Sequence, residues 1–221
     1  MSYIYPDKCM FCGVPVGDGK VACKECFETI PYISGDTCER CGTEKEYCNC
    51  KVGDFAFKQN VSVFYFENSI KKMVYRFKFY KLPQIASVMA DFMAKQVSVK
   101  YKDITFDLVT FVPVSPLKRV FRGYDQSKLL AKAVAERLGL PMEKTLSRKV
   151  FSRSQKYRKG KERRNNVRGK FKASQPLNAK RVLIIDDIMT TGSTLSECAR
   201  VLKREGVKEV FCSTFAISCK K

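Results

Sequence analysis

The segment at residues 182–194, which reads VLIIDDIMTTGST, most constrains how this chain can fold. Its first four residues are apolar and branched, as in a strand that is buried on both faces of a parallel sheet. The carboxylates Asp186 and Asp187 follow, and a loop of small residues then leads into residues 195–204, where apolar side chains recur at helical spacing. The segment therefore predicts a strand, an acidic pair, a loop and a helix, in that order.

The predicted loop is suited to binding a phosphate. A loop that ends at a helix N-terminus presents free backbone N–H groups and the positive end of the helix dipole. Glycine at position 192 permits close backbone approach or a positive φ. Two adjacent carboxylates at the end of a strand can hold sugar hydroxyls or a hydrated Mg²⁺. A sugar phosphate is the expected ligand, and an ordinary strand–turn–helix with a Ser/Thr-rich cap is the simpler alternative.

The same segment resembles the 5-phosphoribosyl-1-pyrophosphate (PRPP) signature of type I phosphoribosyltransferases, in which a hydrophobic run, two acids and a T-T-G-x-T loop occur in this order. The resemblance implies an α/β fold with a mostly parallel sheet over residues 53–221. It implies that Asp186 and Asp187 act in catalysis, and that Arg119 and Mg²⁺ neutralise the pyrophosphate. The implied PRPP-binding loop consists of Thr190, Thr191, Gly192, Ser193 and Thr194.

Eight of the eleven cysteines lie within residues 1–52, in closely spaced pairs. The pairs are Cys9 and Cys12, Cys23 and Cys26, Cys38 and Cys41, and Cys48 and Cys50. Two residues between thiolates is the spacing of a zinc knuckle, and four pairs supply two tetrahedral Cys₄ sites. Such closed sites are structural, and a segment this short would draw most of its stability from metal. We therefore expect a zinc-ribbon-like module at residues 1–52.

Sequential pairing is preferred, with the first four of these cysteines on one zinc and the last four on the other. Cross-braced pairing, a redox pair and an Fe–S cluster are alternatives. The tighter spacing of Cys48 and Cys50 makes the second site less regular. The glycines at 13 and 42 directly follow two pairs, where a tight turn beneath the metal favours glycine. The cysteines at 198, 212 and 219 are expected to be core thiols.

The net charge of +20 is unevenly distributed. Residues 1–60 hold 7 Lys/Arg and 9 Asp/Glu, whereas residues 111–180 hold 20 Lys/Arg and 4 Asp/Glu. Residues 148–172 are the most basic stretch and include interleaved aromatic residues, a mixture that suits single-stranded nucleic acid. A solvated basic loop is the simpler alternative. The candidate DNA-binding residues are Arg122, Lys156, Tyr157, Arg158, Lys159 and Arg163.

Periodicity predicts further elements along the chain. Strands are expected at residues 61–67, 108–114 and 209–218, and helices at 68–79, from Pro83 to about Gln96, and at 125–138. A basic loop at residues 117–124 is expected to follow the strand at 108–114. No run of 18 apolar residues and no signal peptide is present, which predicts a cytoplasmic protein without disulfides.

Motifs across most of the chain resemble the ComF family of competence proteins. They are Pro113-Val114, Arg119, Arg122-Gly123-Tyr124-Asp125-Gln126, Arg148, Gln155, Arg163 and Asn166-Val167-x-Gly169-x-Phe171. Asp125 stands where the family usually has Asn. The resemblance implies a protein of natural transformation that helps single-stranded DNA pass into the cytoplasm. Implied partners are a membrane-associated DNA-uptake helicase, which would bring the protein to the inner face of the membrane, and a recombination mediator.

Two other function classes remain open. In one, the protein is an active phosphoribosyltransferase that transfers phosphoribosyl from PRPP to a base or an amine. In the other, it binds RNA and its PRPP pocket is unused.

Overall fold

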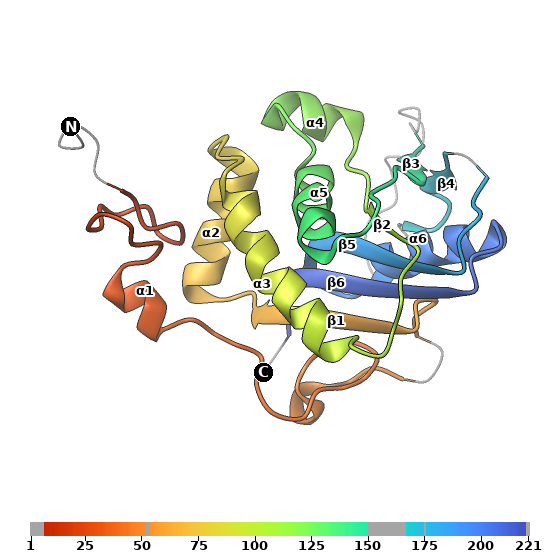
Figure 1. Cartoon of the computed structure of the whole chain (residues 1–221), viewed down its shortest axis with the longest axis horizontal. Helices are drawn as coiled ribbons and strands as arrows, with labels where there is room; N and C mark the ends of the chain where they lie inside the picture. Colours follow the sequence, from red (N-terminus) through yellow and green to blue (C-terminus); the bar gives the residue numbers. More distant parts are fainter. Residues whose placement is uncertain (1–6, 52–53, 150–166, 175, 220–221) are drawn as a thin grey trace, which may run out of the picture.

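The computed structural model describes residues 7–51, 54–149, 167–174 and 176–219. At its centre is a four-stranded sheet in the order β1-β6-β5-β2, in which every neighbouring pair is parallel (Figure 1). The strands are β1 (Gln59–Tyr65), β2 (Leu108–Phe111), β5 (Arg181–Met189) and β6 (Glu209–Ile217). The mostly parallel sheet expected from the sequence is therefore present.

Helices cover both faces of this sheet. One face carries α2 (Asn68–Phe79), α3 (Ile85–Lys100) and α5 (Gln126–Leu138), and the other carries α6 (Ser193–Arg204) (Figure 1). Successive residues of β5 alternate between the two cores, because Leu183 packs with the α2, α3 and α5 side while Val182 and Ile184 pack with the α6 side. Burial on both faces explains why the strand reads as an unbroken apolar run.

Shorter elements complete the described chain. They are α1 (Lys24–Glu28), the 3₁₀ helix η1 (Lys45–Tyr47), α4 (Pro116–Arg122), and the antiparallel pair β3 (Leu146–Arg148) and β4 (Phe171–Ala173). None of the helices in the described residues combines the length and the apolarity that crossing a membrane requires.

Helix α2 occupies the predicted residues, whereas several other boundaries differ. β5 does not end before the acidic pair but continues to Met189, because Asp186 and Ile188 pair with Thr214 and Ala216 of β6. The strand expected at 108–114 ends at Phe111. The helix expected to start at Pro83 begins at Ile85 and reaches Lys100.

Regular structure is also present in two basic segments, of which 117–124 was predicted to be a loop. The basic segment at 117–124 is mostly helical, because α4 starts at Pro116, a residue whose fixed φ favours the first turn of a helix. Both ends of the basic stretch 148–172 are strands, since Arg148 pairs with Phe171 across β3 and β4. Residues 150–166 between them lie outside the described part of the chain.

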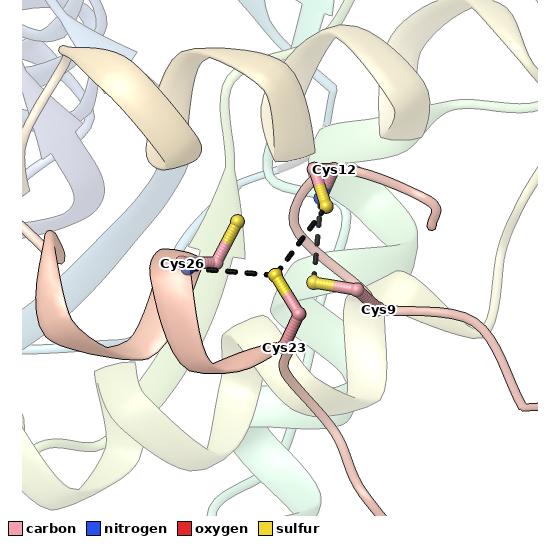
Figure 2. A group of neighbouring side chains, drawn as sticks. All are labelled: Cys9, Cys12, Cys23 and Cys26. Atoms are coloured by element: carbon pink, nitrogen blue, oxygen red, sulfur yellow. Dashed lines mark hydrogen bonds between the residues drawn. The ribbon is translucent and has the colours of Figure 1, made fainter. Parts of the chain in front are cut away.

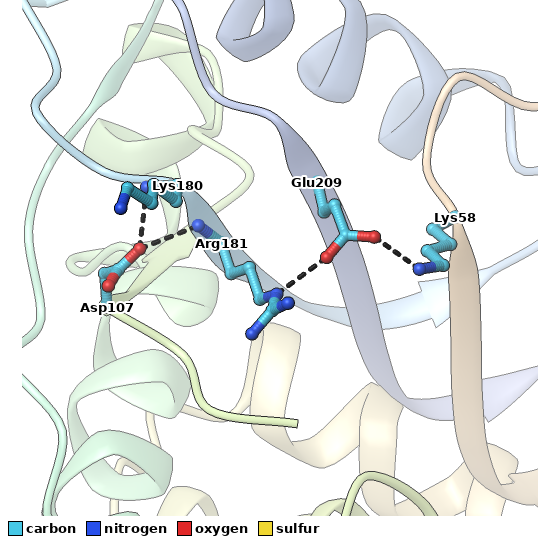
Figure 3. A network of polar contacts seen from close by, with 5 residues as sticks. All are labelled: Lys58, Asp107, Lys180, Arg181 and Glu209. Atoms are coloured by element: carbon cyan, nitrogen blue, oxygen red, sulfur yellow. Dashed lines mark hydrogen bonds and ion pairs between the residues drawn. The ribbon is translucent and has the colours of Figure 1, made fainter. Parts of the chain in front are cut away.

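Ionic contacts join the strands at the amino end of the sheet (Figure 3). Asp107 directly precedes β2, and Arg181 is the first residue of β5. Asp107 Oδ2 accepts hydrogen bonds from the backbone N–H groups of Lys180 and Arg181, both at 2.7 Å. Glu209, at the start of β6, pairs with Arg181 at 2.6 Å and also with Lys58 beside β1. The acidic pair and the loop predicted to bind phosphate lie toward the opposite, carboxyl end of the strands.

The cysteine-rich region contacts the rest of the chain at several places, and two of them hold the cysteine pairs themselves. Arg76 Nη1 of α2 donates to the carbonyls of Cys9 at 2.6 Å and Met10 at 2.9 Å. The backbone N–H of Asn60 in β1 donates to the Arg40 carbonyl at 2.8 Å, and its side-chain amide donates to the Cys41 carbonyl at 2.9 Å. The residues around Cys41 are therefore attached directly to the edge strand of the sheet.

Candidate functional site

The loop between β5 and α6 has the geometry of an anion site. Thr190 and Thr191 are exposed, Gly192 is the N-cap of α6 with a φ of 70°, and the helix begins at Ser193. Glycine has no side chain that could accept the first N–H groups of α6, and the Ser193 N–H makes only a long hydrogen bond of 3.4 Å to Thr191 Oγ1, so this helix N-terminus is suited to receive an anion. Thr191 Oγ1 and Ser193 Oγ lie 2.8 Å apart. The predicted residues from Thr190 to Thr194 are thus gathered around the N-terminus of a twelve-residue helix.

The acidic pair lies at the carboxyl end of β5, where α2 and α5 also reach. Asp186 Oδ1 accepts hydrogen bonds from Ser127 Oγ of α5 and from the Asp187 backbone N–H, both at 3.0 Å. Asp187 Oδ2 forms an ion pair with Lys78 Nζ of α2 at 2.8 Å. Desolvation, reinforced by the neighbouring Asp187 charge, raises the pKa of Asp186 to about 7, against the opposing effects of Lys78 and Ser127.

A basic cavity of about 440 Å³ opens at the carboxyl end of β2. Its charged lining residues are Arg119, Asp125, Lys128, Lys144 and Arg148. Four cations against one carboxylate favour an anionic group such as a phosphate. Asp125, which replaces the family's usual Asn, accepts the Lys128 backbone N–H at 3.1 Å as the N-cap of α5. Both residue types are good N-caps, so this departure leaves the helix start intact.

A second cavity, of about 510 Å³, lies between the β5–α6 loop and the cysteine-rich region. Thr190, Thr191 and Ser193 line one side of it, and Cys41 and Cys50 belong to its lining as well. Arg119 and the loop residues therefore line different cavities, one at the end of β2 and one beside α6.

The candidate DNA-binding residues are only partly placed by the structure. Arg122, at the end of α4, lies over the Phe79 ring with its Cζ atom 5.2 Å from the ring centroid, and donates to Gln126 Oε1 at 3.1 Å. The remaining candidates, Lys156, Tyr157, Arg158, Lys159 and Arg163, lie outside the described residues.

The eight clustered cysteines form two separate groups, as sequential pairing predicts. In the first group, Cys9, Cys12, Cys23 and Cys26 point toward a common centre (Figure 2). The sulfurs of each group lie within 4.8 Å of one another, and Cys12 Sγ and Cys23 Sγ are 3.7 Å apart. Four sulfurs at the usual zinc–sulfur bond length stand about 3.8 Å apart in a tetrahedron. The residues therefore fit a structural zinc ion.

Backbone N–H groups point at the sulfurs of the first group. The N–H of Cys12 donates to Cys9 Sγ, and that of Cys26 donates to Cys23 Sγ, each at 3.5 Å. Burial would raise the pKa of Cys9, but hydrogen bonds from backbone N–H groups outweigh it and lower the pKa to about 6. A thiolate is the form that binds zinc, so the backbone favours the metal-binding state.

The second group contains Cys38, Cys41, Cys48 and Cys50. Cys38 Sγ and Cys50 Sγ are 3.6 Å apart, and Cys41 Sγ and Cys48 Sγ are 3.5 Å apart. The short Cys48–Cys50 spacing therefore still brings both sulfurs to the group. Gly13 and Gly42 have φ values of 88° and 78°, which confirms the glycine turns expected beneath each group.

Sequence reasoning missed three residues at this site. Lys78 and Ser127 contact the acidic pair from α2 and α5, and Phe55 packs against Gly192 from the segment before β1. In the sequence, Lys78 is one of several basic residues at 68–79, and no local pattern marks it as the one that contacts the acidic pair.

Comparison with known proteins agrees with this architecture. Residues 125–220 match the phosphoribosyl transferase domain family, and residues 1–52 match the double zinc ribbon domain. The competence protein ComFC of Streptococcus pneumoniae is 27% identical, over 95% of this chain and 99% of that protein. The chain is a homologue of the ComF competence proteins. The C-terminal region of this ComF homologue has the type I phosphoribosyltransferase fold, because its parallel sheet with helices on both faces agrees with the family match.

Further relatives of this ComF homologue carry two other names. Competence protein F of Haemophilus influenzae is 26% identical, over 85% of each chain. The DNA utilization protein YhgH of Salmonella typhi is 25% identical, over 91% of this chain and 80% of that one. Among solved structures, the glutamine PRPP amidotransferase of B. subtilis is 22% identical with a TM-score of 0.43, over 63% of this chain and 30% of that one. At that TM-score the likeness does not by itself establish the fold.

Proposed function

We propose that this protein binds single-stranded DNA during natural transformation and assists its passage into the cytoplasm, while its β5–α6 loop binds PRPP or a related sugar phosphate. One observation carries the sugar-phosphate part. The acidic pair and the N-terminus of α6 lie at the two ends of one short segment, residues 186–193, at the carboxyl edge of the sheet. In parallel α/β sheets, ligands bind at this edge.

The parts of a phosphoribosyl group can be assigned to these residues. The loop from Thr190 to Thr194 would hold the 5′-phosphate, as anions bind at helix N-termini. Among the described residues, Asp186 Oδ2 and Asp187 Oδ1 accept no hydrogen bond from the protein, so they are available to two ribose hydroxyls. Arg119, in the basic cavity, would face the pyrophosphate.

Magnesium would not be held by the acidic pair alone. Within the described ranges, three or more metal-ligating side chains come together only in the two cysteine groups, so the acidic pair has no third ligand there. Asp187 also already carries the ammonium of Lys78. We infer that Mg²⁺ arrives bound to the pyrophosphate of PRPP, where it would neutralise phosphate charge beside Arg119.

Three facts support the DNA part of the proposal. The excess of 20 Lys/Arg over 4 Asp/Glu at residues 111–180 favours a polyanionic partner. The basic cavity gathers four of those cations at one place. Two of the relatives are named competence proteins, and a third is named a DNA utilization protein. Action with a DNA-uptake helicase at the inner face of the membrane and with a recombination mediator belongs to the same proposal.

Oligonucleotide binding tests the DNA part directly. Affinities for single-stranded DNA, duplex DNA and RNA of equal length are compared, each with and without PRPP and Mg²⁺. If about five phosphates are contacted, the logarithm of the affinity for single-stranded DNA should fall with log salt at a slope of roughly −3.5. Preferential binding of RNA would instead support an RNA-binding protein.

A charge-reversal variant then locates the DNA site. Changing Lys156, Arg158, Lys159 and Arg163 to Glu should weaken binding to all sequences alike and flatten the salt slope, because phosphate contacts carry no base information. The matched control reverses four exposed lysines elsewhere: Lys20, Lys95, Lys102 and Lys208. Tyr157→Ala should lower affinity without changing the slope if its ring stacks on a base. Equal effects of both reversals would contradict a local DNA site.

Active phosphoribosyl transfer is the second candidate function, and the complete acidic pair beside the loop favours it. In that case Asp186 and Asp187 would stabilise the positive charge that develops on the ribose ring. Release of pyrophosphate from PRPP with a panel of bases and amines tests this function. Binding of PRPP without release in any mixture would indicate a sugar-phosphate site that does not turn over with those acceptors.

A further inference from the structure

The acidic pair has a cation supplied by the protein itself. Lys78 Nζ lies 2.8 Å from Asp187 Oδ2, and the two side chains are only 19% and 10% exposed. Water therefore screens this ion pair much less than it screens a surface pair. A carboxylate buried to this extent needs a compensating positive charge in order to remain ionised.

The end of α2 that carries Lys78 is held in place from the α5 side. The hydroxyl of Tyr124 donates to the carbonyl of Phe77, and the two rings lie 5.8 Å apart. Phe77 is fully buried in the core between the helices and the sheet. The following helix, α5, supplies Ser127 to Asp186. Lys78 is thus positioned by packed elements on both sides of the acidic pair.

This arrangement changes what the site needs from solution. Two adjacent carboxylates commonly recruit a divalent cation, but here no third carboxylate within the described residues joins them and an ammonium occupies one oxygen. We propose that Lys78 is the internal counter-cation of the acidic pair, and that it allows the pair to hold the hydroxyls of a sugar phosphate without a divalent metal. The inference rests on the proposed sugar-phosphate site and assigns a positioning residue to it.

Ribose 5-phosphate is the appropriate probe, because it lacks the pyrophosphate that would bring its own Mg²⁺. Its affinity is measured by calorimetry in excess chelator and in excess Mg²⁺. The wild-type protein should bind equally well in both. Lys78→Met should lose about tenfold or more in chelator, the loss expected for one charged contact, and should recover in Mg²⁺.

Three further variants separate charge compensation from a structural role. Lys78→Arg should behave as wild type, whereas Lys78→Gln, which can still donate to Asp187 but carries no charge, should require Mg²⁺. Lys78→Gln also keeps the test valid if Lys78→Met fails to fold. Lys72→Met removes an exposed lysine from the same helix and should bind as wild type in both buffers.

The outcomes distinguish this inference from the proposed function. A wild-type protein that binds ribose 5-phosphate only with Mg²⁺ overturns the inference and keeps the sugar-phosphate site. Wild-type affinity of folded Lys78→Met or Lys78→Gln in chelator also overturns it. A wild-type protein that binds in neither buffer overturns the proposed sugar-phosphate site itself, and the inference falls with it.

Discussion

The ring of Phe55 packs against the backbone of Gly192, so closely that a Cβ atom at position 192 would lie 2.5 Å from Phe55 Cε1. The neighbouring Ala56 N–H donates to Ser196 Oγ in the first turns of α6 at 2.9 Å. The segment that follows the cysteine-rich region is therefore fixed to the candidate phosphate loop. The conformation of the loop depends on residues that precede it in sequence by well over a hundred positions.

Gly192→Ala is expected to impair both stability and sugar-phosphate binding. A side chain at a φ of 70° costs roughly 1–2 kcal/mol, and the contact with Phe55 adds to that. Chemical denaturation and ribose 5-phosphate titration measure the two effects. In the double variant Phe55→Ala/Gly192→Ala, the loss of stability should be smaller than the sum of the single losses, because the Phe55 ring no longer collides with the new Cβ at position 192. Strict additivity would show that the Phe55 contact does not matter.

Gly42→Ala should destabilise the chain more than Gly35→Ala. Both glycines have a positive φ, but a Cβ at position 42 would lie 2.6 Å from the Asn60 carbonyl oxygen of β1, whereas position 35 is open. Gly35→Ala is expected to cost roughly 1–2 kcal/mol and Gly42→Ala clearly more. Urea denaturation of the two variants gives the comparison, and equal losses would contradict the close approach to β1.

Native mass spectrometry should find two zinc ions in the wild-type protein and one each in Cys12→Ser and Cys41→Ser. The first cysteine group meets the rest of the chain through the Arg76 side chain and through buried side chains such as Phe11, whereas the Cys41 backbone carbonyl is hydrogen-bonded to a residue of β1. Cys41→Ser should therefore lower the midpoint of thermal unfolding of the whole chain more than Cys12→Ser does. A metal-free protein with a fully folded cysteine-rich region would contradict structural zinc.

Asp186→Asn should change how stability depends on pH. The pKa of Asp186 is raised to about 7 in the folded protein, from near 4 in an unfolded chain. Between these values the folded state holds a proton that the unfolded state has lost, so the contribution of Asp186 to stability falls as pH rises through this window. The variant should thus gain stability relative to wild type at pH above about 7 and differ little at pH near 4. Denaturation curves across this range measure the difference, and a constant difference would refute the raised pKa.

The sequence alone determined the features that depend on local spacing. The order of strand, acids, loop and helix at residues 182–194 is local, because burial on two faces demands a continuous apolar run and a helix start demands small residues. The extent of α2 followed from its apolar period, and the grouping of Cys9 with Cys12, Cys23 and Cys26 agrees with the pairing preferred from their spacing.

Only the tertiary structure decided which distant residues meet at the site. β5 extends past the acidic pair because Asp186 and Met189 find partners in β6, and pairing between strands is invisible to the periodicity of either one. Lys78, Ser127 and Phe55 reach the site from three separate elements, and their positions depend on how helices pack on the sheet. A local sequence pattern shows which groups can bind a sugar phosphate. The positive charge that compensates Asp187 comes instead from Lys78 in α2, and the sequence of α2 does not show where its last turn will lie.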